Sequence, residues 1–283
     1  MSSYKSVVRN AQKKMVEKGY GEQSALLYLL ELTNKEAHNL YMEFEEEMPK
    51  DIEEAYEQGM QRLLKGEPLG HVLGFEWFYG YRFKVNEHVL IPRPETEELV
   101  ANVLAAYDEF FGGKDIIAAD IGTGSGAIAI SVKKEEPRIH MLASDISEDA
   151  IHVAKENAKE NGVEVSFLIG DMLQPLIDRD MKLDILISNP PYIPNEEEME
   201  DSVVNYEPHV ALFGGDDGLK FYRMIFENAH KILNEKAVLA FEMGYNQKEV
   251  LSEEAKKYFP DARIEVVKDM NGKNRMLFIY VNL

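Results

Sequence analysis

The tetrapeptide Asn189-Pro-Pro-Tyr192 combines residue types that can hold a planar nitrogen. Asn189 has a side-chain carbonyl oxygen. Pro190 lacks an N–H and cannot extend a sheet ladder, so its backbone carbonyl is left free. An amide or aromatic amine nitrogen is a weak nucleophile because its lone pair is delocalised, and two acceptors can grip its two N–H groups where charge develops. Tyr192 offers a flat face to such a group. The tetrapeptide therefore favours chemistry at an amide-type nitrogen, although Asn-Pro-Pro alone is more often a simple strand-ending turn.

A glycine-rich segment, Gly122-Thr-Gly-Ser-Gly126, follows the apolar run Ile116–Ile121 and precedes a helical pattern. Glycines let a backbone turn tightly and approach a ligand, and a helix N-terminus offers unpaired N–H groups. Asp145 ends the next apolar run and can accept hydrogen bonds from ribose hydroxyls. These features predict a nucleoside cofactor. The loop alone does not separate NAD from S-adenosylmethionine, because it also satisfies the dinucleotide pattern G-x-G-x-x-A.

The two motifs together favour S-adenosylmethionine. In an open parallel sheet, ligands collect at the carboxyl ends of strands near the point where strand order reverses. Asn189 follows the run Leu183–Ser188, the fourth strand of the pattern, so it should face the glycine loop. Transfer of a sulfonium methyl depends mainly on holding donor and acceptor in line at about 3–3.5 Å. An NAD enzyme has no need of the tetrapeptide there.

Alternating strands and helices must position these motifs. Strand-like runs and helical segments alternate from residue 115 onward, which predicts βαβ units in an α/β fold with a largely parallel sheet. The last two strands follow each other across Asn271-Gly272 and should form an antiparallel pair. The expected strands are Ile116–Ile121, His140–Ile146, Val165–Ile169, Leu183–Ser188, Ala237–Glu242, Arg263–Val267 and Met276–Val281, and the expected helices include Glu95–Phe110, Glu148–Asn161 and Leu219–Leu233.

The first 72 residues have a different pattern. They predict a small helical domain of three or four segments, broken at Gly19–Gly21, Thr33–Asn34 and Pro49. Its stretch from Glu43 to Glu57 is acid-rich and predicts a solvated helix face. Residues 74–91 change to aromatic and β-branched types and predict a β-hairpin. The expected domains are therefore residues 1–72, a hairpin linker at 73–92, and a catalytic domain at 93–283.

Composition limits the partners. The chain has 283 residues with 51 acidic and 31 basic side chains, a net charge of −20. Such a surface repels phosphate backbones and suits a basic protein partner. Without cysteine the chain has no disulfide or thiolate metal site, and its seven histidines show no ligand-like spacing, so we expect no metal. The N-terminus lacks a signal-peptide core and no apolar run reaches the roughly 18 residues of a membrane span, so we expect a cytoplasmic protein that does not bind membranes.

Several sequence blocks resemble the peptide chain release factor glutamine methyltransferases, also called the HemK family. The blocks are Glu67-Pro-Leu-Gly-His71, Leu90-Ile-Pro-Arg-Pro-Glu-Thr-Glu97, Asp120-Ile-Gly-Thr-Gly-Ser-Gly126, Ser188-Asn-Pro-Pro-Tyr-Ile193, and Tyr206-Glu-Pro208 with Gly214-Gly215. The resemblance implies a class I S-adenosylmethionine-dependent methyltransferase, with a Rossmann-like, seven-stranded, mostly parallel sheet and a small N-terminal helical domain that recognises the partner. It implies N5-methylation of the glutamine in the Gly-Gly-Gln motif of translation release factors, without direct binding of nucleic acid.

The resemblance also implies roles for individual residues. Gly122, Thr123, Gly124, Ser125 and Gly126 would line the methionine end of the cofactor, and Asp145 would hold its ribose. Met172 would pack by the adenine, where some family members have an aromatic residue. Asn189, Pro190, Pro191 and Tyr192 would grip the glutamine amide, with Asn189 also near the cofactor, and Arg93 would help to wall the pocket.

Three other functions fit parts of the pattern. A DNA or RNA methyltransferase acting on adenine N6 or guanine N2 could use the same tetrapeptide, but it would have to capture a base and hold phosphates. A non-catalytic protein could bind the cofactor only structurally, although the intact Asn189-Pro-Pro-Tyr192 argues against that. An NAD oxidoreductase could use the glycine loop.

Overall fold

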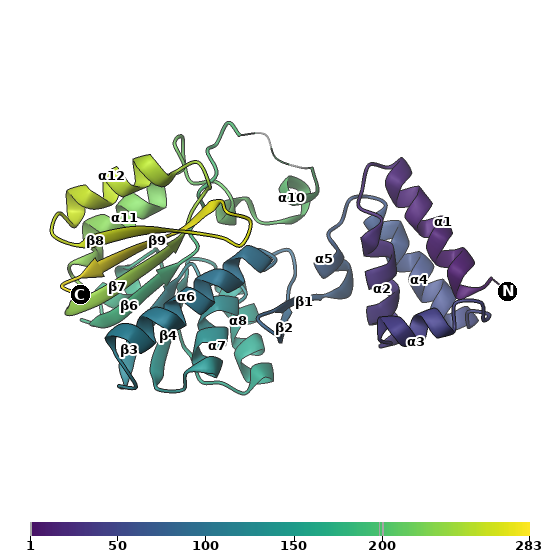
Figure 1. Ribbon diagram of the computed structural model, residues 1–283, viewed down its shortest axis with the longest axis horizontal. Helices are drawn as coiled ribbons and strands as arrows, with labels where there is room; N and C mark the ends of the chain where they lie inside the picture. Colours follow the sequence, from purple (N-terminus) through teal and green to yellow (C-terminus); the bar gives the residue numbers. More distant parts are fainter. Residues whose placement is uncertain (1, 198, 200) are drawn as a thin grey trace. The chain divides into compact units, whose positions relative to one another are not determined.

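The structure is a computed structural model that describes residues 2–197, 199 and 201–283. The chain divides into two compact units (Figure 1). The helical unit comprises Met1–Phe75 with Met199–Tyr206, and the α/β unit comprises Glu76–Glu198 with Glu207–Leu283. Within the described residues, no helix has both the length and the apolar character needed to cross a membrane.

The unit boundaries differ from those expected at residues 72 and 93. The hairpin belongs to the α/β unit because its second strand is tied to a helix there: Lys84 N donates to Asn157 Oδ1 at 2.7 Å, and Asn157 Nδ2 donates to Lys84 O at 3.1 Å. A short helix late in the chain, α10 (Asp201–Tyr206), belongs instead to the helical unit, where the Tyr206 hydroxyl donates to Lys65 O at 3.2 Å.

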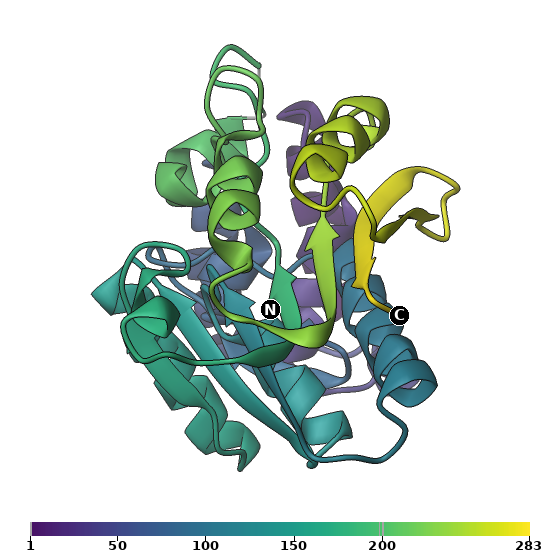
Figure 2. The same ribbon diagram turned by 90° about the vertical axis from the view of Figure 1, so that its left-hand side faces the viewer.

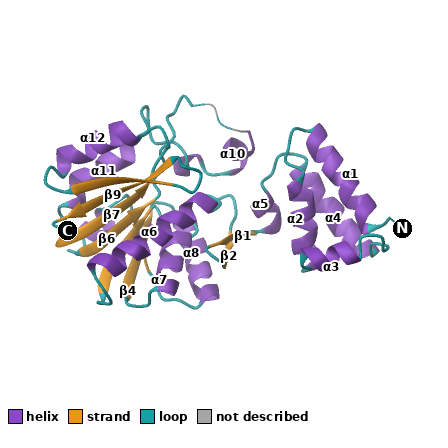
Figure 3. Ribbon diagram, in the orientation of Figure 1, coloured by secondary structure: helices purple, strands orange, loops and turns teal. Residues whose placement is uncertain are grey.

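All regular elements that the structure describes in the first 74 residues are helices (Figure 3). Tyr56, Met60 and Leu63 repeat at helical spacing and are buried in the core of this unit. Asn34 adopts a left-handed conformation (φ 51°) and ends the second helix. The helices are α1 (Tyr4–Glu17), α2 (Gln23–Thr33), α3 (Ala37–Met42), α4 (Lys50–Leu63) and α5 (Leu69–Leu73).

The acid-rich stretch from Glu43 to Glu57 is not one helix. Helix α3 ends at Met42 and α4 begins at Lys50, so about half of the stretch is a connection made of turns. Pro49, whose ring restricts its φ (here −56°), is the N-cap residue of α4. The fully buried Met48 anchors the connection in the core. The expectation of a single acidic helix face was therefore wrong.

The hairpin is shorter than residues 74–91. It consists of β1 (Phe75–Phe78) and β2 (Tyr81–Lys84), joined by Tyr79 (φ 52°) and Gly80 (φ 77°). Two successive positive φ angles are the signature of a type I′ turn, which matches the twist of paired strands. The residues after the hairpin leave the sheet, and Val85, Val89 and Ile91 pack on helix α8 (Glu148–Asn161).

Seven strands form one sheet in the order β5-β4-β3-β6-β7-β9-β8. All neighbouring pairs are parallel except those that involve β9, which runs antiparallel to both β7 and β8. The predicted Rossmann-like, mostly parallel sheet with a closing antiparallel pair is confirmed. The strands are β3 (Ile116–Ile121), β4 (Ile139–Asp145), β5 (Ser166–Ile169), β6 (Leu183–Ser188), β7 (Leu233–Glu242), β8 (Arg263–Lys268) and β9 (Asn274–Val281).

Helices cover both faces of this sheet (Figure 2). Side chains of a strand alternate between faces, so Val238 and Ala240 of β7 join one core while Leu239 and Phe241 join the other. The first core includes α6 and α7, and the second includes α11 and α12. The helices of this unit are α6 (Pro94–Phe110), α7 (Ala127–Glu135), α8, α9 (Gln174–Ile177), α11 (Lys220–Ala229) and α12 (Lys248–Tyr258), with a short 3₁₀ turn at His209–Ala211.

The predicted boundary between α11 and β7 was wrong. The helix expected at Leu219–Leu233 ends at Ala229, and β7 begins at Leu233 rather than at Ala237. Leu233 pairs with Leu183 of β6, and the Leu183 N–H donates to Ile232 O at 2.7 Å. The register then shifts, so that the next pair is Ile185 with Val238, and the polar residues between Leu233 and Val238 form an irregularity in the ladder that has no strand-like pattern.

Candidate active site

The two motifs leave the sheet side by side. Strand β3 lies between β4 and β6, so the chain order reverses at β3. Ile121 and Ser188, the last residues of β3 and β6, are register partners, and Ser188 Oγ donates to Ile121 O at 2.7 Å. Gly122 and Asn189 therefore begin their loops next to each other, as the switch-point argument predicted.

A cleft of about 270 Å³ opens at this edge of the sheet and lies entirely within the α/β unit. Six of the residues named from the sequence line it: Gly122, Gly124, Asp145, Met172, Asn189 and Pro191. The other predicted residues, Thr123, Ser125, Gly126, Pro190 and Tyr192, are not among its lining residues, and all of these except Pro190 have contacts that are described below.

The three glycines of the loop have different surroundings: two face the cleft and one packs against the core. Gly122, Gly124 and Gly126 all have positive φ angles (73°, 53° and 81°). A Cβ at Gly122 or Gly124 would meet no protein atom within 4 Å, so these two positions leave room for a ligand. A Cβ at Gly126 would lie 2.8 Å from Ile130 Cδ1 and 3.1 Å from Ala154 Cβ. The first two glycines therefore open the cleft, and the third permits close packing of α7 on α8.

Thr123 and Ser125 support the loop from behind. Thr123 Oγ1 donates to Asp120 Oδ2 at 2.6 Å, and Asn157 Nδ2 donates to Ser125 O at 2.8 Å. Asp120 is fully buried, and this burial raises the pKa of its carboxyl to about 7, against the opposing effect of the Thr123 hydrogen bond. Sequence reasoning quoted Asp120 within the motif without assigning it this supporting role.

Asp145 ends β4 and faces the cleft. Its Oδ2 accepts a hydrogen bond from Gly124 N at 2.9 Å, and its Oδ1 accepts one from Ser147 N at 2.9 Å. Burial raises the pKa of this carboxyl, and the backbone N–H donors oppose the rise. A carboxylate has about four acceptor positions, so two remain for the hydroxyls of a ribose.

The rest of the cleft is largely apolar. Ile146 is 54% exposed, and Met172 has a positive φ of 44°. Such a backbone conformation costs a non-glycine residue energy and is often retained where a site needs it. Sequence reasoning missed several lining residues because their types are ordinary in a core: Val89, Leu90, Val210, Ala211, Phe221 and Met224. The apolar lining suits a flat adenine ring.

Asn189 is connected to a buried network. Its Nδ2 donates to Thr96 Oγ1 at 3.4 Å, and Thr96 Oγ1 donates to Glu242 Oε2 at 2.6 Å. The Tyr192 hydroxyl donates to the other oxygen of Glu242 at 3.4 Å. Thr96 and Glu242 were missed as site residues. The available signals were the position of Thr96 within the block that ends at Glu97, and the acid Glu242 directly after the apolar run at residues 237–241.

A glycine-rich loop holds the backbone of the tetrapeptide. Gly214 N donates to Ile193 O at 2.8 Å, and a Cβ on Gly214 would lie 2.5 Å from Pro191 O. A Cβ on Gly218 would lie 2.3 Å from Tyr192 O. Gln247 Nε2 donates to the same carbonyl at 3.0 Å. These contacts explain why residues 214 and 218 are glycines, because any other residue would place its Cβ against the backbone of the tetrapeptide.

Arg93 forms an ion pair with the buried Glu207, whose other oxygen accepts a hydrogen bond from Ile91 N at 3.2 Å. Arg93 was expected to help wall the pocket, but it is not among the lining residues of the cleft. Its observed contact is the ion pair with Glu207. The pair fastens the loop before α6 to the segment that follows Tyr206. Leu90, at the start of that loop, does line the cleft.

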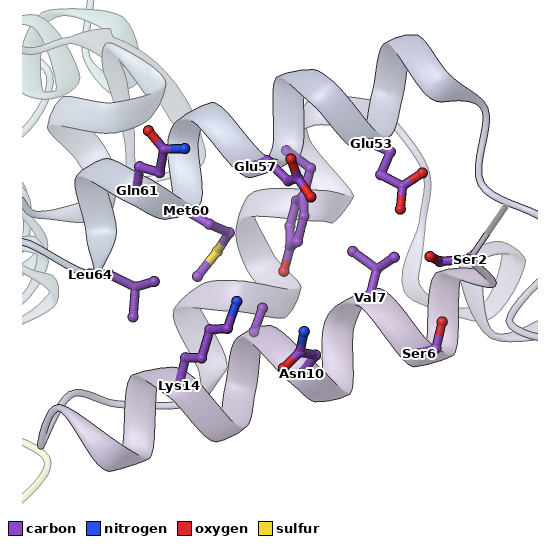
Figure 4. Close-up of a pocket in the computed structure, with 12 residues that line it drawn as sticks. Ser2, Ser6, Val7, Asn10, Lys14, Glu53, Glu57, Met60, Gln61 and Leu64 are labelled. Carbon is purple, nitrogen blue, oxygen red and sulfur yellow. The ribbon is translucent and has the colours of Figure 1, made fainter.

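A second hollow lies within the helical unit, between α1 and α4 (Figure 4). Its volume is about 510 Å³. Asn10 and Lys14 of α1 and Glu53 and Glu57 of α4 contribute polar groups to it, and Met60 also lines it. None of the residues predicted to bind the cofactor or the substrate lines it.

The fold and the cleft define a class I methyltransferase, for which the donor is S-adenosylmethionine. The family description "methyltransferase small domain" matches residues 99–206, and "PrmC N-terminal domain" matches residues 6–74. Among solved structures, a methyltransferase from Pyrococcus furiosus has a TM-score of 0.53 at 17% identity, covering 72% of this chain and 91% of that one. The hMettl16 catalytic domain has a TM-score of 0.53 at 18% identity, covering 71% and 76%. At these identities the likeness shows the fold alone.

Curated relatives identify the family. The release factor glutamine methyltransferase of Bacillus cereus is 43% identical over 264 residues, 93% of each chain. That of Bacillus subtilis is 40% identical over 268 residues, covering 93% of this chain and 92% of the relative. That of Staphylococcus aureus is 37% identical over 279 residues, covering 98% and 99%. The chain belongs to the release factor glutamine methyltransferase family.

Proposed function

We propose that this chain transfers a methyl group from S-adenosylmethionine to the side-chain nitrogen N5 of the glutamine in the Gly-Gly-Gln motif of translation release factors. The observation that carries the proposal is the pairing of Ile121 with Ser188, which starts the glycine loop and Asn189 at adjacent positions. Both then line one cleft. The names of the relatives support a release factor as the substrate.

The chain holds the cofactor with groups that are already in position. Asp145 accepts from the ribose hydroxyls with the lone pairs that Gly124 N and Ser147 N leave free. The open positions at Gly122 and Gly124 admit the methionine end, and Ile146 and Met172 pack on the adenine. When bound, S-adenosylmethionine supplies an electrophilic methyl group.

The tetrapeptide orients the acceptor. Asn189 Oδ1 and Pro190 O accept the two N–H groups of the glutamine amide and fix its nitrogen in line with the methyl group. As positive charge grows on that nitrogen, these two oxygens stabilise it. Pro191 contributes an apolar wall to the cleft, and the ring of Tyr192 supports the amide plane. The nitrogen loses one N–H proton to solvent after the carbon–sulfur bond has broken and the carbon–nitrogen bond has formed, so the site needs acceptors rather than a strong base.

The helical unit recognises the partner. A glutamine side chain alone offers little area, so affinity must come from docking of the whole release factor on surface outside the cleft. The net charge of −20 favours a basic protein over nucleic acid. A partner that works with the ribosome places the enzyme in the cytoplasm, without membrane contact.

Tritiated S-adenosylmethionine tests the proposal with a purified release factor, its Gly-Gly-Ala variant, and DNA and RNA in parallel reactions. We expect label in the intact release factor and its loss when alanine replaces the glutamine. Label in nucleic acid would favour the alternative of an exocyclic amine on adenine or guanine. Label that persists in the Gly-Gly-Ala variant would exclude the assigned acceptor.

A further inference from the structure

Glu242 is a buried acid that the chemistry described so far does not use. It ends β7, is 3% exposed, and lies in the α/β unit among apolar residues. Burying a carboxylate is costly unless several donors satisfy it. Burial raises the pKa of this carboxyl, and the hydroxyls of Thr96 and Tyr192, which donate to it, together with the charge of the Arg275 guanidinium, oppose that rise and favour the ionised form.

We propose that Glu242 is a positioning residue, which acts through Thr96 to fix the direction in which the Asn189 amide faces. The inference rests on the proposed function, because it concerns how the chain presents its acceptor oxygen to the glutamine. Glu242 is not among the residues that line the cleft. It sets the geometry of the residue that does.

The direction of the hydrogen bonds carries the argument. An ionised carboxylate only accepts, so the Thr96 hydroxyl must point its proton at Glu242, over 2.6 Å. The Thr96 oxygen can then only accept from Asn189, which places Nδ2 on the protein side, at 3.4 Å. Oδ1 is left on the opposite side, as the acceptor for a substrate N–H. Without Glu242, Thr96 could donate instead, and the Asn189 amide could turn its NH₂ group toward the substrate.

The same carboxylate restrains Tyr192. Burial, together with the adjacent Glu242 charge, raises the pKa of the Tyr192 phenol, so the phenol keeps its proton and donates to Glu242. Tyr222 fixes the backbone at this point, because its hydroxyl donates to Glu242 O at 2.6 Å. Glu242, on the neighbouring strand, therefore restrains both ends of the tetrapeptide: Asn189 through Thr96, and Tyr192 directly.

The effect of the network on catalysis can be separated from its effect on folding. The test variants are Glu242→Gln, Thr96→Val, which removes the hydroxyl at nearly constant shape, and Thr96→Ser, which keeps it. Two changes serve as matched controls outside the network: Glu254→Gln, a buried acid on α12 with its own cationic partners, and Ser131→Ala, a buried hydroxyl on α7. Each full-length protein is assayed for methylation of an intact release factor, for S-adenosylmethionine affinity, and for thermal unfolding.

We expect Thr96→Val and Glu242→Gln to lower kcat roughly 10- to 100-fold, with cofactor affinity and KM changed much less, because the lost geometry matters in the transition state. Thr96→Ser should restore most of the rate, and the two control variants should keep it. In an Asn189→Ala background, Thr96→Val should have little further effect, because the group that it positions is gone.

Two results would overturn the inference. One is a wild-type kcat in folded Thr96→Val. The other is a loss in Thr96→Val that adds fully to the loss in Asn189→Ala. If Glu242→Gln does not fold, the Thr96 variants and the double-mutant cycle of Thr96→Val with Asn189→Ala still test the positioning role. Failure of the proposed function would look different, since the wild-type protein itself would not label the release factor glutamine.

Discussion

Asp145 Oδ2 accepts the backbone N–H of Gly124 at 2.9 Å, so the acid expected to hold the ribose also fixes the loop expected to hold the methionine end. The second oxygen of Asp145 accepts from Ser147 N at the start of α8. One side chain at the end of β4 therefore couples the two halves of the cofactor cleft.

Replacing Asp145 with alanine should weaken S-adenosylmethionine binding by about 1–3 kcal/mol, the scale of losing charge-assisted hydrogen bonds. Isothermal calorimetry measures this directly. Asp261→Ala removes an exposed acid in the turn before β8, away from the cleft, and serves as the control, with affinity expected to stay near that of wild type. Unchanged affinity in Asp145→Ala would remove the ribose role. Binding of NAD in place of S-adenosylmethionine would remove the whole cofactor assignment.

Asn189→Ala should reduce turnover by roughly 10²-fold or more, the scale of removing one transition-state hydrogen-bond partner. Cofactor affinity should change much less, although Asn189 lines the same cleft. Steady-state rates with an intact release factor, compared with calorimetry, separate the two effects. A variant with normal kcat and merely weaker cofactor binding would contradict the orienting role.

Gly126→Ala and Gly124→Ala should fail in different ways. At Gly126 the new Cβ would press on Ile130 and Ala154 in a left-handed backbone, so we expect a loss of about 1–3 kcal/mol in the free energy of unfolding. At Gly124 the Cβ meets open space on the ligand side, so the main loss should be cofactor affinity, with only the smaller cost of the positive φ in stability. Denaturant unfolding and calorimetry on both variants check the contrast. Equal losses of stability would show that the two glycines are not specialised.

Asp120 should give a distinct pH dependence of stability. Its folded-state pKa is raised to about 7 by burial, above the ordinary 3.8. A carboxyl with a raised pKa favours the folded state when protonated, so its contribution is complete below about pH 4 and declines as pH rises toward 7. Asp120→Asn removes the ionisation while keeping an acceptor for Thr123. The difference in unfolding free energy between this variant and wild type should shift in favour of the variant by up to a few kcal/mol between pH 4 and 8. A difference that stays constant across this range would contradict the shifted pKa.

Local sequence patterns were enough to predict a helix or strand where residues within it, or directly next to it, fix its ends. Helix α8 has the predicted bounds Glu148–Asn161 because Ser147 caps its start by accepting from Ala150 N and Gly162, at φ 68°, ends it. Strand β6 has the predicted bounds Leu183–Ser188 because its run is apolar between polar neighbours. The start of β7 was missed because its polar residues are held by partners in other parts of the chain, such as the Asn234 Nδ2 bond to Asp184 Oδ1 at 2.7 Å.

At the active site, too, the sequence failed to predict features that depend on contacts between distant parts of the chain. The glycine loop and the tetrapeptide could be placed at one sheet edge because strand order follows from βαβ connectivity. The hydrogen bond between Thr96 and Glu242 joins residues 146 positions apart, and neither residue type is unusual where it stands. Contacts of that kind depend on how α6 packs against the end of β7, which no local pattern encodes.

Exposed acids of the helical unit should contribute to recognition of the release factor. Glu46, Glu47 and Glu54 lie exposed in the acid-rich stretch, and Glu45 is already paired with Lys5. Changing the three free acids to glutamine should raise KM for the intact release factor. It should also flatten the dependence of KM on salt, because charges separated by more than about 8–10 Å are screened at physiological ionic strength.

The matched control for this prediction also removes three charges: it replaces Glu249 and Glu253, two exposed acids of α12, with glutamine and the exposed Asp261 with asparagine. Both proteins should bind S-adenosylmethionine as the wild type does, since neither change reaches the cleft. A KM that rises only in the helical-unit variant assigns the effect to that surface rather than to net charge. An equal rise of KM in both variants would show that the effect comes from long-range attraction by the whole acidic protein and not from the surface of the helical unit. No change in either, at low as well as physiological salt, would rule out an electrostatic part in docking and leave shape complementarity on the helical unit as the source of affinity.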